Sequence, residues 1–254
     1  MALFCFIKEQ LLNLRDICFP MCCCSCGEMV DSEGLCPKCW KRIKWVSDPR
    51  CRICGVPFEL DISSLCPQCI SKPPHFDQAI SVFEYDDFSK TMILKFKHGD
   101  ATYMGKLLAV WMHRVAAGLT ADLIIPVPIH FLKRLKRRYN QTELLAMELE
   151  RLCGVPQEPR ILEKEKQTSP QEGLTRSTRL RNIKGSFGVN PGYARLLVGK
   201  KVILVDDVLT TGATVNECAR ILKKHGAEKV MVLTAARVNL DRVHLSTGPL
   251  LQPE

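Results

Sequence analysis

The chain has 254 residues, of which 46% are hydrophobic and 25% are charged, and its formal net charge is +9. This is the composition of an ordinary globular protein with one large or two modest domains. It excludes a fibrous chain and a chain that is disordered throughout. No segment contains the roughly 18–20 uncharged apolar residues that a membrane span needs.

The N-terminal segment, residues 1–17, is predicted to form a helix in which charged residues interrupt the apolar ones. Lys8, Glu9, Arg15 and Asp16 leave no charge-free apolar core of the kind that a secretory signal peptide contains. We therefore expect the protein to remain in the cytoplasm, where thiols stay reduced.

Cysteines dominate the next segment. Of the 14 cysteines, only Cys153 and Cys218 lie after residue 70, on predicted helices where we expect them to be buried. The earlier ones include four Cys-x-x-Cys pairs: Cys23 and Cys26, Cys36 and Cys39, Cys51 and Cys54, and Cys66 and Cys69. A two-residue spacer lets both thiolates of a pair face one ion, and two pairs complete a closed tetrahedral site. The sequence therefore predicts one or two structural Zn²⁺ ions, with Gly27 and Gly55 at turns that often need a positive φ.

The assignment of zinc ligands leaves alternatives open. An even number of cysteines also suits a disulfide framework, although a reducing compartment argues against it. Consecutive pairs could share an ion, or the first and third pairs could do so in a crossed arrangement. Cys22 or Cys24 could replace Cys23 as a ligand. In every arrangement the metal is structural, because this segment has too few large apolar residues to form a core by itself.

Zinc also changes the charge balance of the chain. Each site of four thiolates is formally −2, so two sites lower the net charge from +9 to about +5. Net charge alone is therefore a weak indication of nucleic-acid binding. Trp40 and Trp45 lie beside basic residues, and we expect them to cover a metal-binding turn. Stacking on nucleic-acid bases is the alternative for these two side chains.

After Pro74 the apolar pattern alternates between strands and helices. The predicted strands are 79–85, 123–127, 202–205 and 230–233, and the predicted helices lie around 92–96, 107–115, 142–152 and 213–225. Asn140 is the expected N-cap of the third helix. The alternation predicts an α/β fold, a parallel sheet with helices on both faces. We expect a helix and zinc-binding domain over 1–74, the α/β domain over 75–238 and a flexible tail over 239–254.

The clearest chemical pattern follows the apolar segment Val202–Val205. Asp206 and Asp207 come at its carboxyl end, where open α/β sheets bind ligands. The next turn offers hydroxyls and backbone N–H groups at the start of a helix, through Thr210, Thr211, Gly212, Ala213 and Thr214. Such a turn attracts anions through its N–H groups and the helix dipole. Two carboxylates beside it suit a sugar phosphate, and the alternative is an acidic helix start after a core strand.

The segment VILVDDVLTTGAT resembles the fingerprint of type I phosphoribosyltransferases. The resemblance implies the fold of that family, a parallel sheet flanked by helices. It also implies that Asp206 and Asp207 bind the ribose hydroxyls of phosphoribosyl pyrophosphate (PRPP). Residues 210–214 would then bind its 5-phosphate, and Mg²⁺ would accompany its pyrophosphate.

Further segments resemble the ComF family of competence-associated proteins, in which a double zinc ribbon precedes a transferase domain. They are LIIPVPIHFLKRLKRRYNQTELLA, Gln171 with Leu174, and Arg179 with Asn182 ahead of Gly185 and Phe187. Arg138 departs from the pattern, because it occupies a position where that family usually has glycine. The resemblance implies an association with DNA uptake.

Basic residues are densest after the second predicted strand, at Lys133, Arg134, Lys136, Arg137 and Arg138. We expect Arg137, Arg138, Asn140 and Gln141 to reach pyrophosphate, while a nucleic-acid contact or a solvated loop are the alternatives. The sequence thus favours a PRPP-binding phosphoribosyltransferase-like protein, without indicating its acceptor. The alternative is a non-catalytic module that binds single-stranded DNA or a protein of the competence machinery.

Overall fold

The structure, a computed structural model, describes residues 21–60, 63–98, 102–129, 140–164, 183 and 185–239. The predicted N-terminal helix, the basic residues 133–138, the motif residues at 171–182 and residues 240–254 of the tail lie outside this part. The chain divides into two compact units, Met1–Lys44 and Trp45–Glu254. The third and fourth cysteine pairs therefore share a compact unit with the sheet, while the domain boundary at residue 74 stays a prediction.

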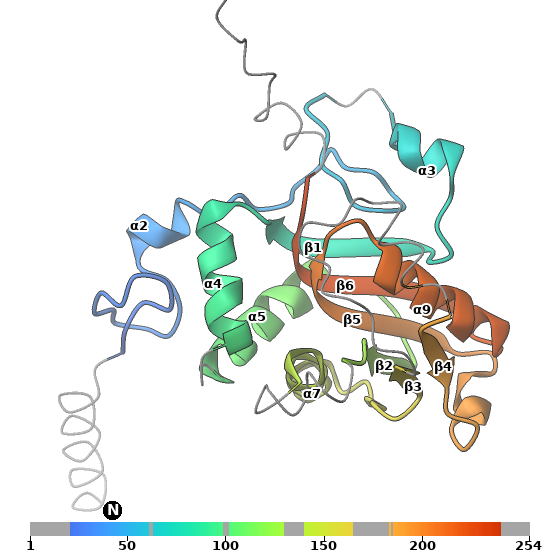
Figure 1. Cartoon of the computed structure of the whole chain (residues 1–254). Coiled ribbons are helices and arrows are strands. Elements are labelled where there is room, and N and C mark those ends of the chain that lie inside the picture. The colour runs from blue at the N-terminus through green and yellow to red at the C-terminus, as the bar shows by residue number, and fades with distance from the viewer. Residues whose placement is uncertain are drawn as a thin grey trace, which may run out of the picture. The chain divides into compact units, whose positions relative to one another are not determined.

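The first unit contains one short helix, α2 (Pro37–Trp40), among its described residues (Figure 1). Cys36 is the N-cap, and its sulfur accepts a hydrogen bond from the N–H of Cys39. Pro37 fits the first helical position because no backbone donor is needed there. Gly27, which follows the first cysteine pair, has a φ of 80°, so the predicted positive φ at this turn is confirmed.

The second unit is built on a four-stranded sheet. Its strands are β1 (Gln78–Glu84), β2 (Leu123–Pro126), β5 (Lys201–Leu209) and β6 (Lys229–Arg237). They lie in the order β1-β6-β5-β2, and all neighbouring pairs are parallel (Figure 1). The parallel sheet predicted from the apolar alternation is confirmed. Strand β5 extends beyond the predicted residues 202–205, a difference that changes the position of the acid pair.

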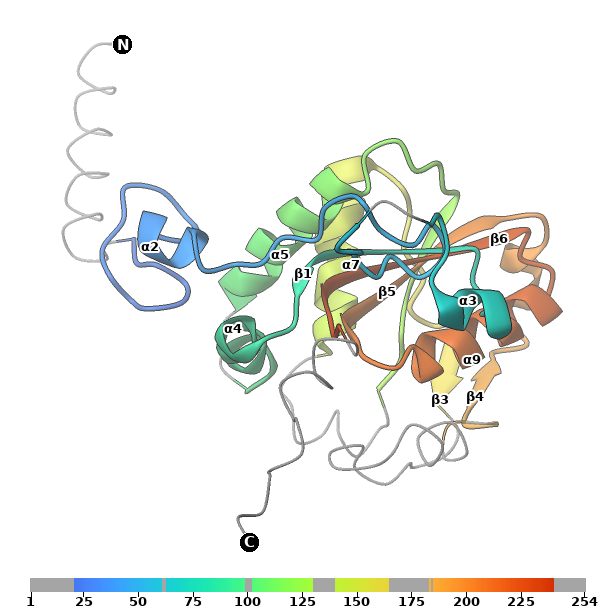
Figure 2. The same ribbon diagram turned by 90° about the horizontal axis from the view of Figure 1, so that it is seen from above.

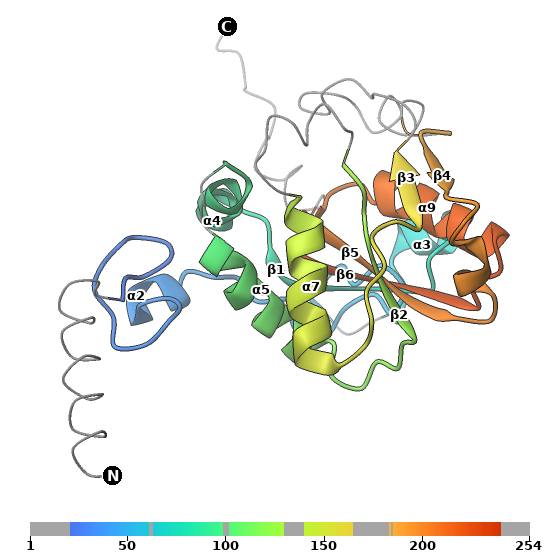
Figure 3. The same cartoon turned by 90° about the horizontal axis from the view of Figure 1, so that it is seen from below.

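Helices cover both faces of this sheet. They are α4 (Asp87–His98), α5 (Thr102–Val115), α7 (Gln141–Cys153) and α9 (Ala213–Lys224). Figures 2 and 3 show α5 and α7 on one face and α9 on the other. Among the described helices, none combines the length and the apolar character that crossing a bilayer requires.

A second, smaller sheet pairs β3 (Leu162–Lys164) with β4 (Phe187–Val189) in antiparallel fashion. Strand β4 contacts α9, and a 3-10 helix, η1 (Ala194–Leu197), follows it. This sheet brings Lys164 close enough to the end of β5 to interact electrostatically with Asp206.

The core between the sheet and α9 explains why one of the two cysteines predicted to be buried is buried and the other is not. Alternate residues of β5, including Val202 and Leu204, pack against α9 together with Cys218, which is fully buried as predicted. Cys153, in contrast, is exposed. It ends α7 beyond Leu149, the last buried residue of that helix, so it has no core to contact.

The segment with the third and fourth cysteine pairs lies along the free edge of β1. The N–H of Val46 donates to the carbonyl of Val82 at 2.9 Å, and the N–H of Ala79 donates to the carbonyl of Ile53 at 2.6 Å. Gly55 has a φ of 73°, and a Cβ on it would lie 2.5 Å from the Ala79 carbonyl oxygen. Glycine is therefore required here both by backbone conformation and by the close approach to β1. The fourth cysteine pair begins helix α3 (Pro67–Ser71).

Trp45 also belongs to the sheet unit. Its ring packs edge-to-face on Phe83 and on Trp111, with centroid distances of 6.4 and 5.3 Å. The prediction that Trp45 covers a metal-binding turn is wrong, because its large apolar ring is used to fill the space between β1 and α5.

Candidate functional site

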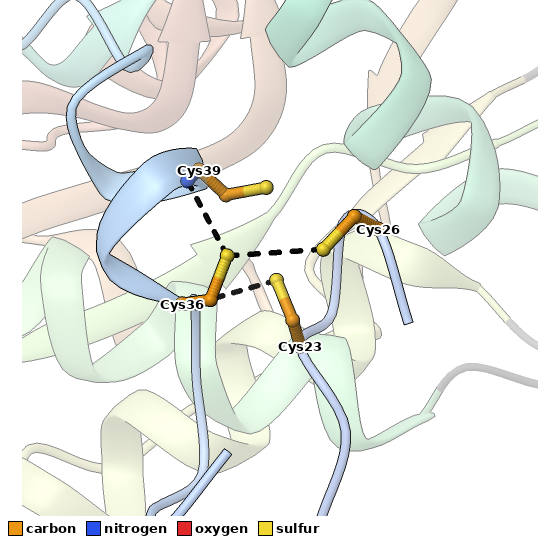
Figure 4. A group of neighbouring side chains, drawn as sticks. All are labelled: Cys23, Cys26, Cys36 and Cys39. Atoms are coloured by element: carbon orange, nitrogen blue, oxygen red, sulfur yellow. Dashed lines mark hydrogen bonds between the residues drawn. The ribbon is translucent and has the colours of Figure 1, made fainter. Parts of the chain in front are cut away.

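The first cysteine cluster unites the first two pairs (Figure 4). The sulfur atoms of Cys23, Cys26, Cys36 and Cys39 all lie within 4.8 Å of one another. Cys26 Sγ and Cys36 Sγ are 3.8 Å apart, and the N–H of Cys36 donates to Cys23 Sγ at 3.3 Å. Four sulfurs at the usual Zn–S distance of about 2.3 Å form a tetrahedron with edges of about 3.8 Å. The donor set and its spacing therefore fit a Zn²⁺ ion.

The second cluster repeats this arrangement with Cys51, Cys54, Cys66 and Cys69, again within 4.8 Å of one another. Cys54 Sγ and Cys66 Sγ lie 3.6 Å apart, and the N–H of Cys66 donates to Cys51 Sγ at 3.4 Å. Consecutive pairs therefore share a site, and the crossed arrangement is not the one observed. The structure also groups Cys23, rather than its neighbours Cys22 and Cys24, with the other three thiols of the first site.

The protonation of the thiols explains why each cluster needs a cation. Burial opposes ionisation of Cys23, but the N–H groups of Cys26, Cys36 and Ser25 donate to its sulfur and lower its pKa to about 6. Burial, followed by hydrogen bonding to Cys36, raises the pKa of Cys39 to about 12. One thiol can thus ionise at neutral pH while another in the same cluster stays protonated. A bound Zn²⁺ supplies the positive charge that makes four thiolates stable together.

The same contrast occurs in the second cluster. N–H groups of Cys54, Cys66 and Ile53 outweigh burial and lower the pKa of Cys51 to about 7. Burial raises the pKa of Cys54 to about 11. Both clusters are therefore suited to structural zinc, because every cysteine is used and no ligand position is left for a reacting group.

The acid pair lies inside β5, not after it as predicted. Asp206 pairs with Thr234 of β6, whereas the pairing of β5 with β2 ends at Val205. The two acids therefore lie just past the carboxyl end of β2, where β5 keeps β6 as a neighbour but no longer pairs with β2. The backbone N–H of Asp207 donates to Asp206 Oδ1 at 2.9 Å, which fixes the Asp206 carboxyl group against the strand.

Lys97, at the end of α4, is the cation in direct contact with this pair. Its Nζ lies 2.9 Å from Asp207 Oδ2, and the two side chains are 22% and 13% exposed. Burial opposes the charge of Lys97, but the attraction of Asp207 outweighs it and raises the Lys97 pKa. The lysine is therefore charged beside Asp207 at neutral pH.

Asp206 has a strongly shifted pKa. Burial, followed by repulsion from Asp207, raises the pKa of Asp206 to about 7, against the opposing effects of the Asp207 N–H, Lys97 and Lys164. At neutral pH and without a ligand, Asp206 is therefore only about half ionised. A ligand that donates hydrogen bonds or brings a cation would favour full ionisation.

The threonine turn connects β5 to α9. Gly212 is the N-cap of α9 with a φ of 74°, and no side chain caps the helix there. Ala213 N–H reaches only Thr211 Oγ1, at a long 3.4 Å. Thr210, Thr211 and Thr214 are partly exposed, so hydroxyls and first-turn N–H groups are open to an anion. The predicted strand, turn and helix thus follow one another, with the acid pair inside the strand rather than after it.

Asn140 and Gln141 have local roles in the described structure. Asn140 is 4% exposed and caps α7 by accepting a hydrogen bond from Thr142 N–H at 3.2 Å. Gln141 is 2% exposed, and its Nε2 donates to the Lys97 carbonyl at 2.9 Å. Gln141 therefore holds the end of α4 that carries Lys97. A direct contact of these two residues with pyrophosphate stays a prediction, and Arg137 and Arg138 lie outside the described residues.

Sequence reasoning missed two residues, Lys97 and Arg237. Lys97 stands between Phe96 and His98, outside every motif that the sequence analysis identified, so nothing there points to it. Arg237 ends the apolar strand β6 and is only 6% exposed. A charged residue at the end of a buried strand was a signal that the sequence did contain, because buried charges are rare unless they are paired.

Two domain families match the chain: the double zinc ribbon domain over residues 14–70 and the phosphoribosyl transferase domain over residues 160–249. Curated relatives match most of its length. Competence protein F of Haemophilus influenzae is 31% identical over 82% of this chain and 92% of its own.

The DNA utilization protein YhgH of Salmonella typhimurium is 30% identical, over 80% of this chain and 90% of its own. Competence protein ComFC of Bacillus subtilis is 28% identical, over 81% and 85% respectively. With both matched domains in the same order, this chain belongs to the ComF family of competence-associated proteins, in which a double zinc ribbon precedes a phosphoribosyltransferase domain.

Proposed function

We propose that this protein binds PRPP at the end of β5 and transfers its phosphoribosyl group to an acceptor. The observation that carries the proposal is the order of groups along one strand and helix. Asp206 and Asp207 lie in β5 beyond the end of β2, and the last residues of β5 lead from them to the threonine turn and the uncapped start of α9. The carboxylates would accept hydrogen bonds from the ribose hydroxyls, and the turn at 210–214 would bind the 5-phosphate.

The pyrophosphate of PRPP would lie toward Lys97, with Arg137 and Arg138 of the basic loop as further cations. Transfer breaks the bond between C1 and pyrophosphate, and positive charge develops on the ribose. Asp206 and Asp207 would stabilise that charge while orienting the ring. Their oxygens are also ligands that magnesium prefers, and Mg²⁺ carried by PRPP would offset the charge of the leaving group.

The raised pKa of Asp206 predicts a pH dependence of PRPP affinity. Because the ionised carboxylate is the better acceptor, affinity should rise about tenfold per pH unit below pH 7 and level off above it. Calorimetric titration between pH 5.5 and 8.5 would measure the profile. The matched control is Asp206→Asn, which cannot ionise. It should bind more weakly at pH 8 and lose this component of the profile, and an unchanged profile would separate Asp206 from the binding step.

The raised pKa of Asp206 also predicts that stability depends on pH, in the direction opposite to that of PRPP affinity. The folded state binds the Asp206 proton more tightly than the unfolded state, so stability decreases as pH rises from about 4 to 7. Between pH 5 and pH 8 the wild type should lose about 2 kcal/mol more unfolding free energy than Asp206→Asn. Urea unfolding at the two pH values would measure the difference, and equal losses would contradict it.

A second candidate function is binding of single-stranded DNA, favoured by relatives named for competence and DNA utilization. Contacts from the basic loop would make affinity for a labelled oligothymidylate fall at least tenfold between about 50 and 200 mM salt. Arg137→Ala with Arg138→Ala should flatten that dependence, whereas Lys224→Ala should leave it unchanged. A flat response in the wild type would reject DNA binding through this loop.

We also propose that the protein acts in the cytoplasm, alone or with proteins of the competence machinery. The support is chemical, since eight thiols in two clusters remain zinc ligands only where they stay reduced.

A further inference from the structure

A cavity of about 480 Å³ lies between the second cysteine cluster and the threonine turn, within the sheet unit. This volume is in the usual range of small-molecule sites. One wall is the turn Leu209–Ala213, and the opposite wall includes Pro67 and Gln68 of α3. Figure 2 shows α3 beside α9. Asp206, Asp207 and Lys97 are not among the residues that line it, so the cavity is separate from the acid pair.

Arg237 is the feature of this cavity that points to a ligand. Its side chain lines the cavity and is 6% exposed. One arm of the guanidinium, Nη1, donates to the carbonyl of Cys54. Its Nε is buried and has no hydrogen-bond partner among the described residues. A buried donor of this kind normally has an acceptor, and the described protein groups provide none.

The remaining charges around the cavity are also positive. Lys72 lines it, and the uncapped first turn of α9 contributes the positive end of a helix dipole. None of the described lining residues is an aspartate or a glutamate. Nη1 of Arg237 is already used by the Cys54 carbonyl. Lys72, Nε of Arg237 and the turn therefore remain for an anionic group.

Part of the wall is apolar and rigid. Val56, Phe76 and Leu209 are buried, and Pro73 and Pro74 add surfaces with little conformational freedom. Such a slot favours a flat ring over a flexible chain, because ring and wall lose little entropy on contact.

We propose that this cavity binds a small planar organic acid. Its carboxylate accepts a hydrogen bond from Arg237 Nε and is attracted by Lys72, and its ring packs against the apolar wall. The cavity shares the turn at 209–213 with the proposed 5-phosphate site but not the acid pair, so a variant of the acid pair distinguishes the two proposals.

The test uses two pairs of probes that differ in charge but hardly in shape: nicotinate with nicotinamide, and benzoate with benzamide. Each is titrated calorimetrically into the zinc-loaded full chain. We expect one site, with at least one acid bound about tenfold or more tightly than its amide. Equal affinities within both pairs, or no binding of either acid, would overturn the proposal.

Variants locate the binding. Lys72 lies on the exposed rim of the cavity, and Lys72→Met should reduce the preference for the acid over its amide at least threefold. Lys224 lies at the far end of α9, and Lys224→Met should leave that preference unchanged. Gln68→Trp, also exposed, should block the cavity and abolish binding of the acid. Arg237→Gln should remove the preference where the variant folds. Asp206→Ala with Asp207→Ala should retain it, and loss of acid binding in that variant would instead place the acid in the ribose-phosphate site.

Discussion

Replacing Cys66 by serine is expected to destabilise the whole sheet unit, lowering its melting temperature by about 10 °C or more. The second cluster is attached to β1 through the hydrogen bond between Ala79 and Ile53, and Arg237 of β6 donates to Cys54. Losing one thiolate weakens the zinc site, and structural zinc contributes several kcal/mol or more to the fold that it closes. The effect should therefore reach strands far from the metal.

Cys36→Ser is the matched control, because Cys36 has the same position in the first cluster and belongs to the other compact unit. It should lower the zinc content from two ions to one per chain and leave the melting temperature of the sheet unit within about 2 °C. Fluorescence of Trp45 and Trp111 in a Trp40→Phe background reports on the sheet unit alone. Equal effects of the two serine variants would contradict the division into units.

Replacing both Asp206 and Asp207 by alanine is expected to abolish release of pyrophosphate from PRPP. Each carboxylate would lose charged hydrogen bonds to the ribose, worth about 1.5–3 kcal/mol apiece, so the combined loss is about a hundredfold or more. The assay supplies PRPP, Mg²⁺ and pooled nucleobases and follows pyrophosphate.

The melting temperature of the double variant is measured as a control for its fold. Removal of Asp206 should not lower the melting temperature at pH 8, because burial disfavours its ionised form. Removal of Asp207 takes the ion-pair partner from Lys97 and should lower it, so pyrophosphate release is measured well below the melting temperature of the variant. Pyrophosphate release that continues unchanged in the folded double variant would remove both acids from the mechanism. Glu163→Gln, on β3, serves as a matched acidic residue outside the pair and should release pyrophosphate like the wild type.

The parts of the site that could be predicted from sequence are those encoded by neighbouring residues. A two-residue spacer brings two thiols to one ion whatever surrounds them, and an apolar strand followed by a threonine turn has one common geometry. Asn140 could be predicted as a helix cap for the same reason, since its hydrogen bond is to Thr142, two residues away.

Contacts between distant segments could not be predicted in this way. Lys97 meets Asp207 only because α4 and β5 are adjacent in the fold, and Arg237 meets Cys54 across a sequence separation of 183 residues. The end of β5 was misplaced because β6 continues to pair with it past Asp206, to Leu209. A polar residue in a strand is tolerated where a neighbouring strand still satisfies its backbone.

The grouping of cysteine pairs was left open by sequence for a physical reason. Spacing fixes which two thiols act together, but not which two pairs meet. The structure pairs them consecutively, and it joins the second cluster to the sheet by backbone hydrogen bonds that carry no side-chain signature. Trp45 was misassigned for a similar reason, because its partners Phe83 and Trp111 belong to other elements.

The central claim is that the acids of β5 and the turn before α9 together hold a phosphorylated ribose. Calorimetric titration of the zinc-loaded wild type with PRPP in the presence of Mg²⁺ tests it most directly. We expect one binding event per chain, which disappears when Asp206 and Asp207 are both alanine. Absence of any binding by the wild type, or equal binding by the double variant, would contradict the account.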